Sequence, residues 1–209
     1  MKFEEEFKNA ISQLSSKDKD KLILRLLKRD LVLANQLYFE LVSSDNVQSR
    51  RLEMENIIKD TIKRATDRYY FPGYLLLDVR DVSGKITEHV KITKDKYGDA
   101  SLNLLMLNEL LKNSNEKIAT SNLNKSYTLC IYIIARAFKI LTLIKALHED
   151  FFIEFEEGLM ELGKLINNNP MLMKIAISNG FDVNWLMQAC IPDNIAAIHK
   201  DVRAKGFLR

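Results

Sequence analysis

The residues whose types and spacing best suit chemistry lie between positions 148 and 161. Glu154, Glu157 and Glu161 are spaced at i, i+3 and i+7, which would place them on one face of a helix, and His148 precedes them. Carboxylate oxygens and imidazole nitrogens are ligands for divalent metal ions. Apolar side chains alternate with these residues at helical spacing, so the acids also fit the solvated face of a helix that packs on a core. We favour that explanation, predict no metal and no cofactor, and keep a metal-dependent helical enzyme as an alternative.

The rest of the sequence contains no arrangement that predicts catalysis. His89 and His199 have no partner at the spacing of helical metal ligands, and neither a Gly-x-Ser-x-Gly elbow nor a glycine-rich phosphate loop occurs. Cys130 and Cys190 lie in apolar runs without a Cys-x-x-Cys spacing, which predicts reduced, buried thiols of low reactivity. The sequence therefore predicts no catalytic residue and leans against an enzyme.

A cluster of basic residues could bind nucleic acid. It lies within residues 47–69 and consists of Lys59, Lys63, Arg64 and Arg68. Phosphate backbones are bound by such cations, and tyrosines nearby could stack on bases. However, acidic residues lie between them, and the net charge of the chain is only +3, from 31 basic and 28 acidic side chains. A solvated helix face is the favoured explanation, and nucleic-acid binding is the alternative.

An aromatic connector gives the best candidate for recognition. It consists of Tyr69, Tyr70, Phe71 and Tyr74, grouped around the only Pro-Gly pair in the chain. Aromatic side chains are favoured at protein interfaces because they offer a large contact area at a low entropy cost. The structural alternative is a corner between two helices whose rings pack inward. We favour that structural explanation, and we keep these four residues as the candidate for binding a protein partner.

The elements that must position these residues are predicted to be helices. Apolar residues recur at steps of three and four along most of the chain, and only 7 Gly and 3 Pro interrupt it. Helices are expected over 2–14 and from a cap at Ser15 or Ser16 to about 29, and Asp30 is expected to cap a helix over 31–42. Further helices are expected over 47–69, 102–111, 171–178, 183–190 and 193–205, besides the segment 127–169. Asp99 or Ser101 is expected to cap the helix 102–111, with polar connectors at 94–98 and 113–124.

Residues 74–93 fit two structures. Apolar residues at steps of four and three favour a helix, but Ser83-Gly84 and several β-branched residues leave a β-hairpin open as an alternative. We favour the helix, because the segment lacks the strict alternation of a half-buried strand.

The segment 127–169 is predicted to form the central helical hairpin of the fold. Its first half, 127–147, is the most apolar part of the chain, but Arg136, Lys139 and Lys145 interrupt it, which argues against a membrane span. The N-terminus has acid where an export signal needs an apolar run, so we predict a soluble, cytoplasmic protein.

These patterns predict an all-α fold of about ten helices in a single domain, residues 1–209. Stacked antiparallel hairpins in a superhelix-like array and an irregular orthogonal bundle fit equally well. The function predicted from the sequence is that of a non-catalytic cytoplasmic scaffold or adaptor. Its partner is expected to be a protein, either another chain or a second copy, and not a membrane.

Overall fold

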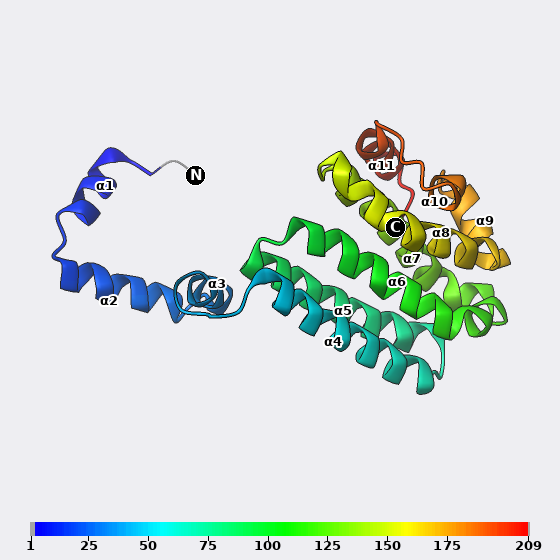
Figure 1. The fold of residues 1–209 in the computed structure, drawn as a ribbon, viewed down its shortest axis with the longest axis horizontal. Helices are drawn as coiled ribbons and strands as arrows, with labels where there is room; N and C mark the ends of the chain where they lie inside the picture. The colour runs from blue at the N-terminus through cyan, green and yellow to red at the C-terminus, as the bar shows by residue number, and fades with distance from the viewer. Residues whose placement is uncertain (1–2, 209) are drawn as a thin grey trace.

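The computed structural model describes residues 3–208, except the side chain of Leu123, and shows an all-α protein (Figure 1). The chain is 79% helical, with eleven α-helices and no strand among the described residues. The elements are α1 (Glu5–Ser12), α2 (Ser16–Leu27), α3 (Leu31–Leu41), α4 (Val47–Asp67), α5 (Pro72–Thr93), α6 (Lys96–Ala119), α7 (Leu123–Lys145), the 3-10 helix η1 (Glu149–Phe155), α8 (Glu156–Asn167), α9 (Pro170–Ser178), α10 (Asn184–Met187) and α11 (Ile195–Ala204).

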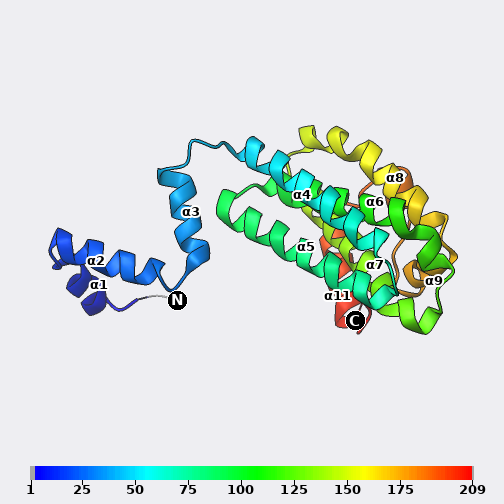
Figure 2. The same cartoon turned by 90° about the horizontal axis from the view of Figure 1, so that it is seen from below.

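Helices α4 to α11 form a body that contains the hydrophobic core. Helices α4, α5 and α6 pack against one another, and α7 packs on α5 and α6. Helices α9 and α11 cover α7, whereas α8 and α10 extend the body from α6 (Figures 1 and 2). All fully buried apolar side chains among the described residues lie at or after Ile58. The body is therefore an irregular stack of helices with one continuous core.

The predicted central hairpin over 127–169 is wrong in its second half. Helix α7 is central, but α8 packs mainly against α6 and α10. The 3-10 helix η1 carries the chain away from α7, and two glycines let α8 approach its other neighbours closely. A Cβ atom at Gly158 would lie 2.9 Å from Leu104 Cδ2 in α6, and one at Gly163 would lie 2.9 Å from the Met187 backbone nitrogen in α10. Gly158 and Gly163 are therefore the feature of the sequence that indicates how α8 packs on α6 and α10.

Helix α7 is the one described helix that is long and apolar enough to cross a membrane. Of the 18-residue stretch of α7 with the highest mean hydropathy, 56% is buried inside the protein. Its cations also bond within the body, because Arg136 Nη1 donates to Asn103 Oδ1 at 3.1 Å and Lys139 Nζ donates to Asp99 Oδ1 at 3.2 Å. These features are consistent with the core helix of a soluble protein.

The helix predicted over 74–93 is confirmed as α5, which begins at Pro72. Proline suits the first helical position, where no backbone N–H is needed for the hydrogen-bond ladder. Val79, Val82 and Ile86 are buried on one face, and Gly84 lies on the opposite, open side of the same helix. Burial of this stripe outweighs the turn tendency of Ser83-Gly84.

The helix predicted over 102–111 is too short. Helix α6 runs from Lys96 to Ala119, and its N-cap is Asp95, whose Oδ1 accepts from the Gly98 N–H at 2.8 Å. The polar segment after residue 111 stays helical because its side chains find partners inside the body. Ser114 Oγ donates to the Leu110 carbonyl oxygen, and Asn115 Nδ2 donates to the Leu165 carbonyl oxygen at 2.7 Å.

Helices α1 to α3 extend away from the body as an N-terminal arm, residues 3–42 (Figures 1 and 2). None of the residues in these three helices, all of which the structure describes, is buried. Only α3 packs on the body, against α5. The caps predicted at Ser15 and Asp30 are confirmed, and Lys2, where the first predicted helix starts, lies outside the described residues. The prediction of a single domain over residues 1–209 stays a prediction.

Candidate interaction surface

Helix α1 carries an apolar stripe that no part of the described chain covers. Phe3, Phe7, Ile11 and Leu14 follow one another at steps of four, four and three, which places them on one face of the helix and its flanks. Their exposed fractions are 56%, 51%, 36% and 37%. The rings of Phe3 and Phe7 lie 5.6 Å apart, so the stripe is continuous at its start.

Helix α2 carries a second and broader apolar face. Ser15 begins it, because its side chain accepts from the Asp18 N–H at 3.2 Å. Ile23, Leu24 and Leu26 are 49%, 60% and 52% exposed. At the elbow between α1 and α2, Lys19 Nζ donates to the Ser12 carbonyl oxygen at 2.9 Å. The two apolar faces are therefore available at the same time.

Helix α3 joins the arm to the body by packing along α5. Lys94 Nζ at the end of α5 donates to Gln36 Oε1 at 3.1 Å, and the Arg50 guanidinium lies 5.6 Å from the centre of the Phe39 ring. The outer side of α3 remains open, with Leu31 71% and Leu41 78% exposed. The arm is thus anchored at its base and free beyond it.

The exposed apolar area of the arm has the size of a protein interface. The seven large apolar side chains of α1, α2 and their flanks expose about 700 Å² if each offers about 200 Å². This area is divided between two helix faces, and one side of a standard protein interface is about 800 Å². Helices of 8 and 12 residues are also marginal by themselves, because isolated helices shorter than about 12–15 residues are barely stable in water.

The aromatic connector predicted to bind a partner is divided by the structure. Tyr69 is half-buried, and its hydroxyl lies 2.9 Å from Ser121 Oγ, which ties α4 to α6. Tyr70, Phe71 and Tyr74 are 84%, 44% and 56% exposed. The Phe71 ring folds over Gly73 and lies 4.5 Å from the Tyr74 ring. Tyr69 therefore serves the corner between the helices, and the other three rings form a smaller open patch.

The basic residues considered for nucleic-acid binding all lie on α4 or at its end. Lys59, Lys63, Arg64 and Arg68 are exposed. Arg64 Nε donates to the Asp60 backbone carbonyl at 3.2 Å, and Arg64 Nη2 donates to Thr61 Oγ1 at 3.4 Å. The role of this face in nucleic-acid binding stays a prediction.

The residues considered for a metal site point to different partners. His148 Nδ1 lies 3.1 Å from Asp150 Oδ2, Glu154 accepts from the Tyr97 hydroxyl at 2.8 Å, and Glu161 lies 3.0 Å from Lys112 Nζ. Glu157 is exposed on α8, and Glu154 belongs to η1, so the expected continuous α-helical face does not form. Among residues 3–208 no group of three or more His, Cys, Asp and Glu side chains is placed to hold a metal ion.

A buried ionic cluster joins α4, α5 and α6, and sequence analysis did not find it. Arg51 forms two hydrogen bonds to the Asp95 carboxylate, at 2.7 and 2.9 Å, and its guanidinium lies 4.5 Å from the centre of the Tyr97 ring. His89 Nε2 is buried 3.8 Å from Asp95 Oδ2 and has no hydrogen-bond partner in the described part of the chain. Because these residues come from three separate helices, sequence spacing carries no signal for the cluster.

The charge of this cluster follows from its contacts. Burial alone would raise the pKa of the Asp95 carboxyl, but the His89 ring, the Arg51 guanidinium and the Gly98 N–H together hold that pKa far below its usual value. Burial also raises the pKa of Tyr97 to about 12, with a further contribution from the hydrogen bond to Glu154. Asp95 is thus a permanent anion that caps α6 and binds Arg51, which is a structural task.

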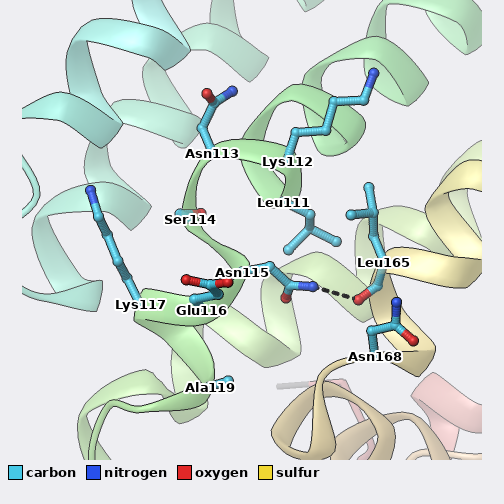
Figure 3. Close-up of a pocket in the computed structure, with 10 residues that line it drawn as sticks. All are labelled: Leu111, Lys112, Asn113, Ser114, Asn115, Glu116, Lys117, Ala119, Leu165 and Asn168. Atoms are coloured by element: carbon cyan, nitrogen blue, oxygen red, sulfur yellow. Dashed lines mark hydrogen bonds between the residues drawn. The ribbon is translucent and has the colours of Figure 1, made fainter.

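Two of the hollows on the body are lined by polar side chains. The larger, about 400 Å³, lies between the C-terminal half of α6 and the end of α8 (Figure 3). Asn115 reaches across it to the Leu165 carbonyl oxygen, and Lys117 Nζ donates to the Thr66 carbonyl oxygen at 2.8 Å. The second, about 240 Å³, lies between α4 and α5 beside His89. The polar groups of the larger hollow hold helices together, and neither hollow contains a catalytic pair.

The two cysteines occupy different surroundings. Cys130 is buried in α7 as predicted, and its burial raises the pKa of the thiol to about 12. The prediction that Cys190 is buried is wrong, because α10 ends at Met187 and leaves Cys190 exposed. The backbone turns left-handed at Ala189, with φ of 48°, so the helix ends before the apolar pattern does.

Comparison of the chain with protein-family models, with curated proteins and with solved structures gave no match.

Proposed function

We propose that this chain is a non-catalytic, cytoplasmic scaffold or adaptor protein and that its N-terminal arm binds a protein partner. The observation that carries the proposal is the arm itself, in which two amphipathic helices expose about 700 Å² of large apolar side chains. Water-exposed apolar area of this size costs free energy that contact with another protein recovers. The partner is a protein because α1 and α2 offer helical apolar stripes, which dock into grooves or against other helices.

The exposed aromatic patch of Tyr70, Phe71 and Tyr74 supports the same class of function. It lies at the corner between α4 and α5, and Leu77, 59% exposed, follows Tyr74 at a step of three on α5. Tyrosine is enriched at the energetic centres of interfaces. This patch is smaller than the arm and is proposed as a second contact for the scaffold.

Site-specific photocrosslinking tests the function of the arm. A photoreactive phenylalanine analogue replaces Phe7 in the full chain, and the matched control places it at Ile177, an apolar residue of α9 that is 71% exposed. We expect discrete protein adducts from position 7 that Ile11→Asp abolishes, and few from position 177. If position 7 gives no protein adduct, or the same adducts as position 177, the arm is not a binding element.

Nucleic-acid binding through α4 remains the alternative prediction. Titration with DNA and RNA at two salt concentrations separates it from the adaptor function, because each phosphate contact makes the affinity depend on salt. A steep salt slope that Lys63→Gln and Arg64→Gln together reduce would favour the alternative.

A further inference from the structure

The apolar area of the arm matches what a pair of arms would need. If the faces of α1 and α2 from two chains covered one another, about 1,400 Å² would be buried in total, within the range of about 1,200–2,000 Å² for stable interfaces. No other molecule needs to contribute a complementary groove, because each arm offers two apolar helices of similar length, 8 and 12 residues.

The charges on the two helices are complementary. Helix α1 begins with acid, at Glu5 and Glu6, directly after Glu4. Helix α2 ends with base, at Arg25, and the chain continues with Lys28 and Arg29. Two helices that lie antiparallel bring the start of one beside the end of the other. Such pairing would place carboxylates against cations and would also align the helix dipoles favourably.

The same pairing does not occur within one arm. Helices α1 and α2 are joined by only three residues and diverge at an elbow (Figure 1), where Lys19 Nζ donates to the Ser12 carbonyl oxygen. The complementary faces of one chain are therefore kept apart and are both free for another chain. In a dimer with a twofold axis, α1 of the first chain would cover α2 of the second, and α1 of the second chain would cover α2 of the first. Each apolar face would then be covered once.

We propose that the occupant of the arm is a second copy of this chain, held in a twofold dimer in which α1 of each arm packs antiparallel on α2 of the other. This inference rests on the proposed function of the arm and names its partner. The dimer leaves the body and its aromatic corner free, so the assembled scaffold displays two copies of the Tyr70, Phe71 and Tyr74 patch.

The first test uses the unmodified full chain at increasing concentration. Analytical ultracentrifugation is expected to show the mass rise from that of one chain to that of two. Hydrogen exchange in the same samples is expected to slow at residues 5–27 and to stay constant in α9. A chain that is monomeric throughout overturns the inference. If crosslinks from position 7 then reach a different protein, the proposed function survives, and if they reach none, both fail.

The second test reverses charges in two matched variants. One carries Glu5→Lys and Glu6→Lys, and the other carries Arg25→Glu and Lys28→Glu. Each variant alone places like charges together at two symmetric contacts, so its dimer is expected to weaken about tenfold or more. An equimolar mixture pairs the altered α1 with the altered α2 and is expected to restore dimerisation.

Two results of the second test contradict the arrangement, and the exchange profile of the first test gives a third. Dimers that neither variant weakens would place the interface elsewhere. A mixture that fails to restore the dimer would exclude the antiparallel pairing, provided that circular dichroism shows unchanged helix content. If a variant loses helix content, the exchange profile of the unmodified chain decides alone, and protection outside residues 5–27 overturns the inference. Closure of each arm on itself is excluded if protection depends on concentration.

Discussion

Replacement of Phe138 by alanine should destabilise the body strongly, whereas the same replacement at Phe7 should not. Phe138 is fully buried in α7 and lies among other rings. Its ring centre is 4.8 Å from that of Phe181 at an interplanar angle of 80°, and 5.1 Å from that of His199 at 6°. Phe7 lies on the arm and is 51% exposed.

The magnitude follows from the burial and from the ring contacts. Loss of a fully buried phenylalanine costs about 3–5 kcal/mol, because the lost transfer energy and the cavity add. Each aromatic pair contributes about 0.5–1.5 kcal/mol of this beyond area alone. Exposed side chains change the free energy of unfolding by no more than about 0.5 kcal/mol, so Phe7→Ala should be nearly neutral in the monomer. The two identical changes therefore differ by about 3 kcal/mol or more.

Urea unfolding at a concentration where the chain is monomeric measures this difference. Trp185 is the only tryptophan, and its ring centre lies 5.9 Å from that of Phe138, so its fluorescence reports on this cluster. Circular dichroism gives the helix content of the same samples. Similar free energies of unfolding for the two variants would refute the assignment of α7 as the core helix and of the arm as uncovered.

Other predictions follow from single contacts in the body. Gly163→Ala should destabilise the fold by about 1–3 kcal/mol, because the new Cβ would lie 2.9 Å from a backbone nitrogen. Gly84→Ala has no described atom within 4 Å of its Cβ and should stabilise α5 by about 0.5–1 kcal/mol. Thermal unfolding measures both changes. Asp95→Asn should cost about 3 kcal/mol at neutral pH. Because the pKa of the Asp95 carboxyl is lowered by folding, its contribution is full above about pH 4 and is lost as pH falls further, so the two denaturation curves should converge in acid. A thiol reagent should titrate Cys190 alone in the native chain and also Cys130 after unfolding.

The sequence predicted the helices of the arm but not their exposure. A stripe such as Phe3, Phe7, Ile11 and Leu14 shows that one helix face requires cover, but it does not show which molecule supplies that cover. The all-α class, α5 and the caps at Ser15 and Asp30 could be predicted because their signals are local, namely apolar periodicity and capping side chains.

The errors in the prediction arose where distant parts of the chain meet. Helix α6 continues through Asn113, Ser114 and Asn115 because they bond to carbonyl oxygens, one of them in α8, which lies about fifty positions away in the sequence. The cluster of Arg51, His89 and Asp95 likewise joins three helices. Tertiary partners of this kind override local helix propensity, and no local pattern reveals them.

Photocrosslinking from position 7, measured against position 177, tests the central claim most directly. The claim is that the N-terminal arm is the surface on which this scaffold binds protein, and it predicts a high yield of discrete protein adducts at position 7 that is lost with Ile11→Asp. Equal yields from both positions, or adducts from position 7 that persist in the Ile11→Asp chain, would contradict it.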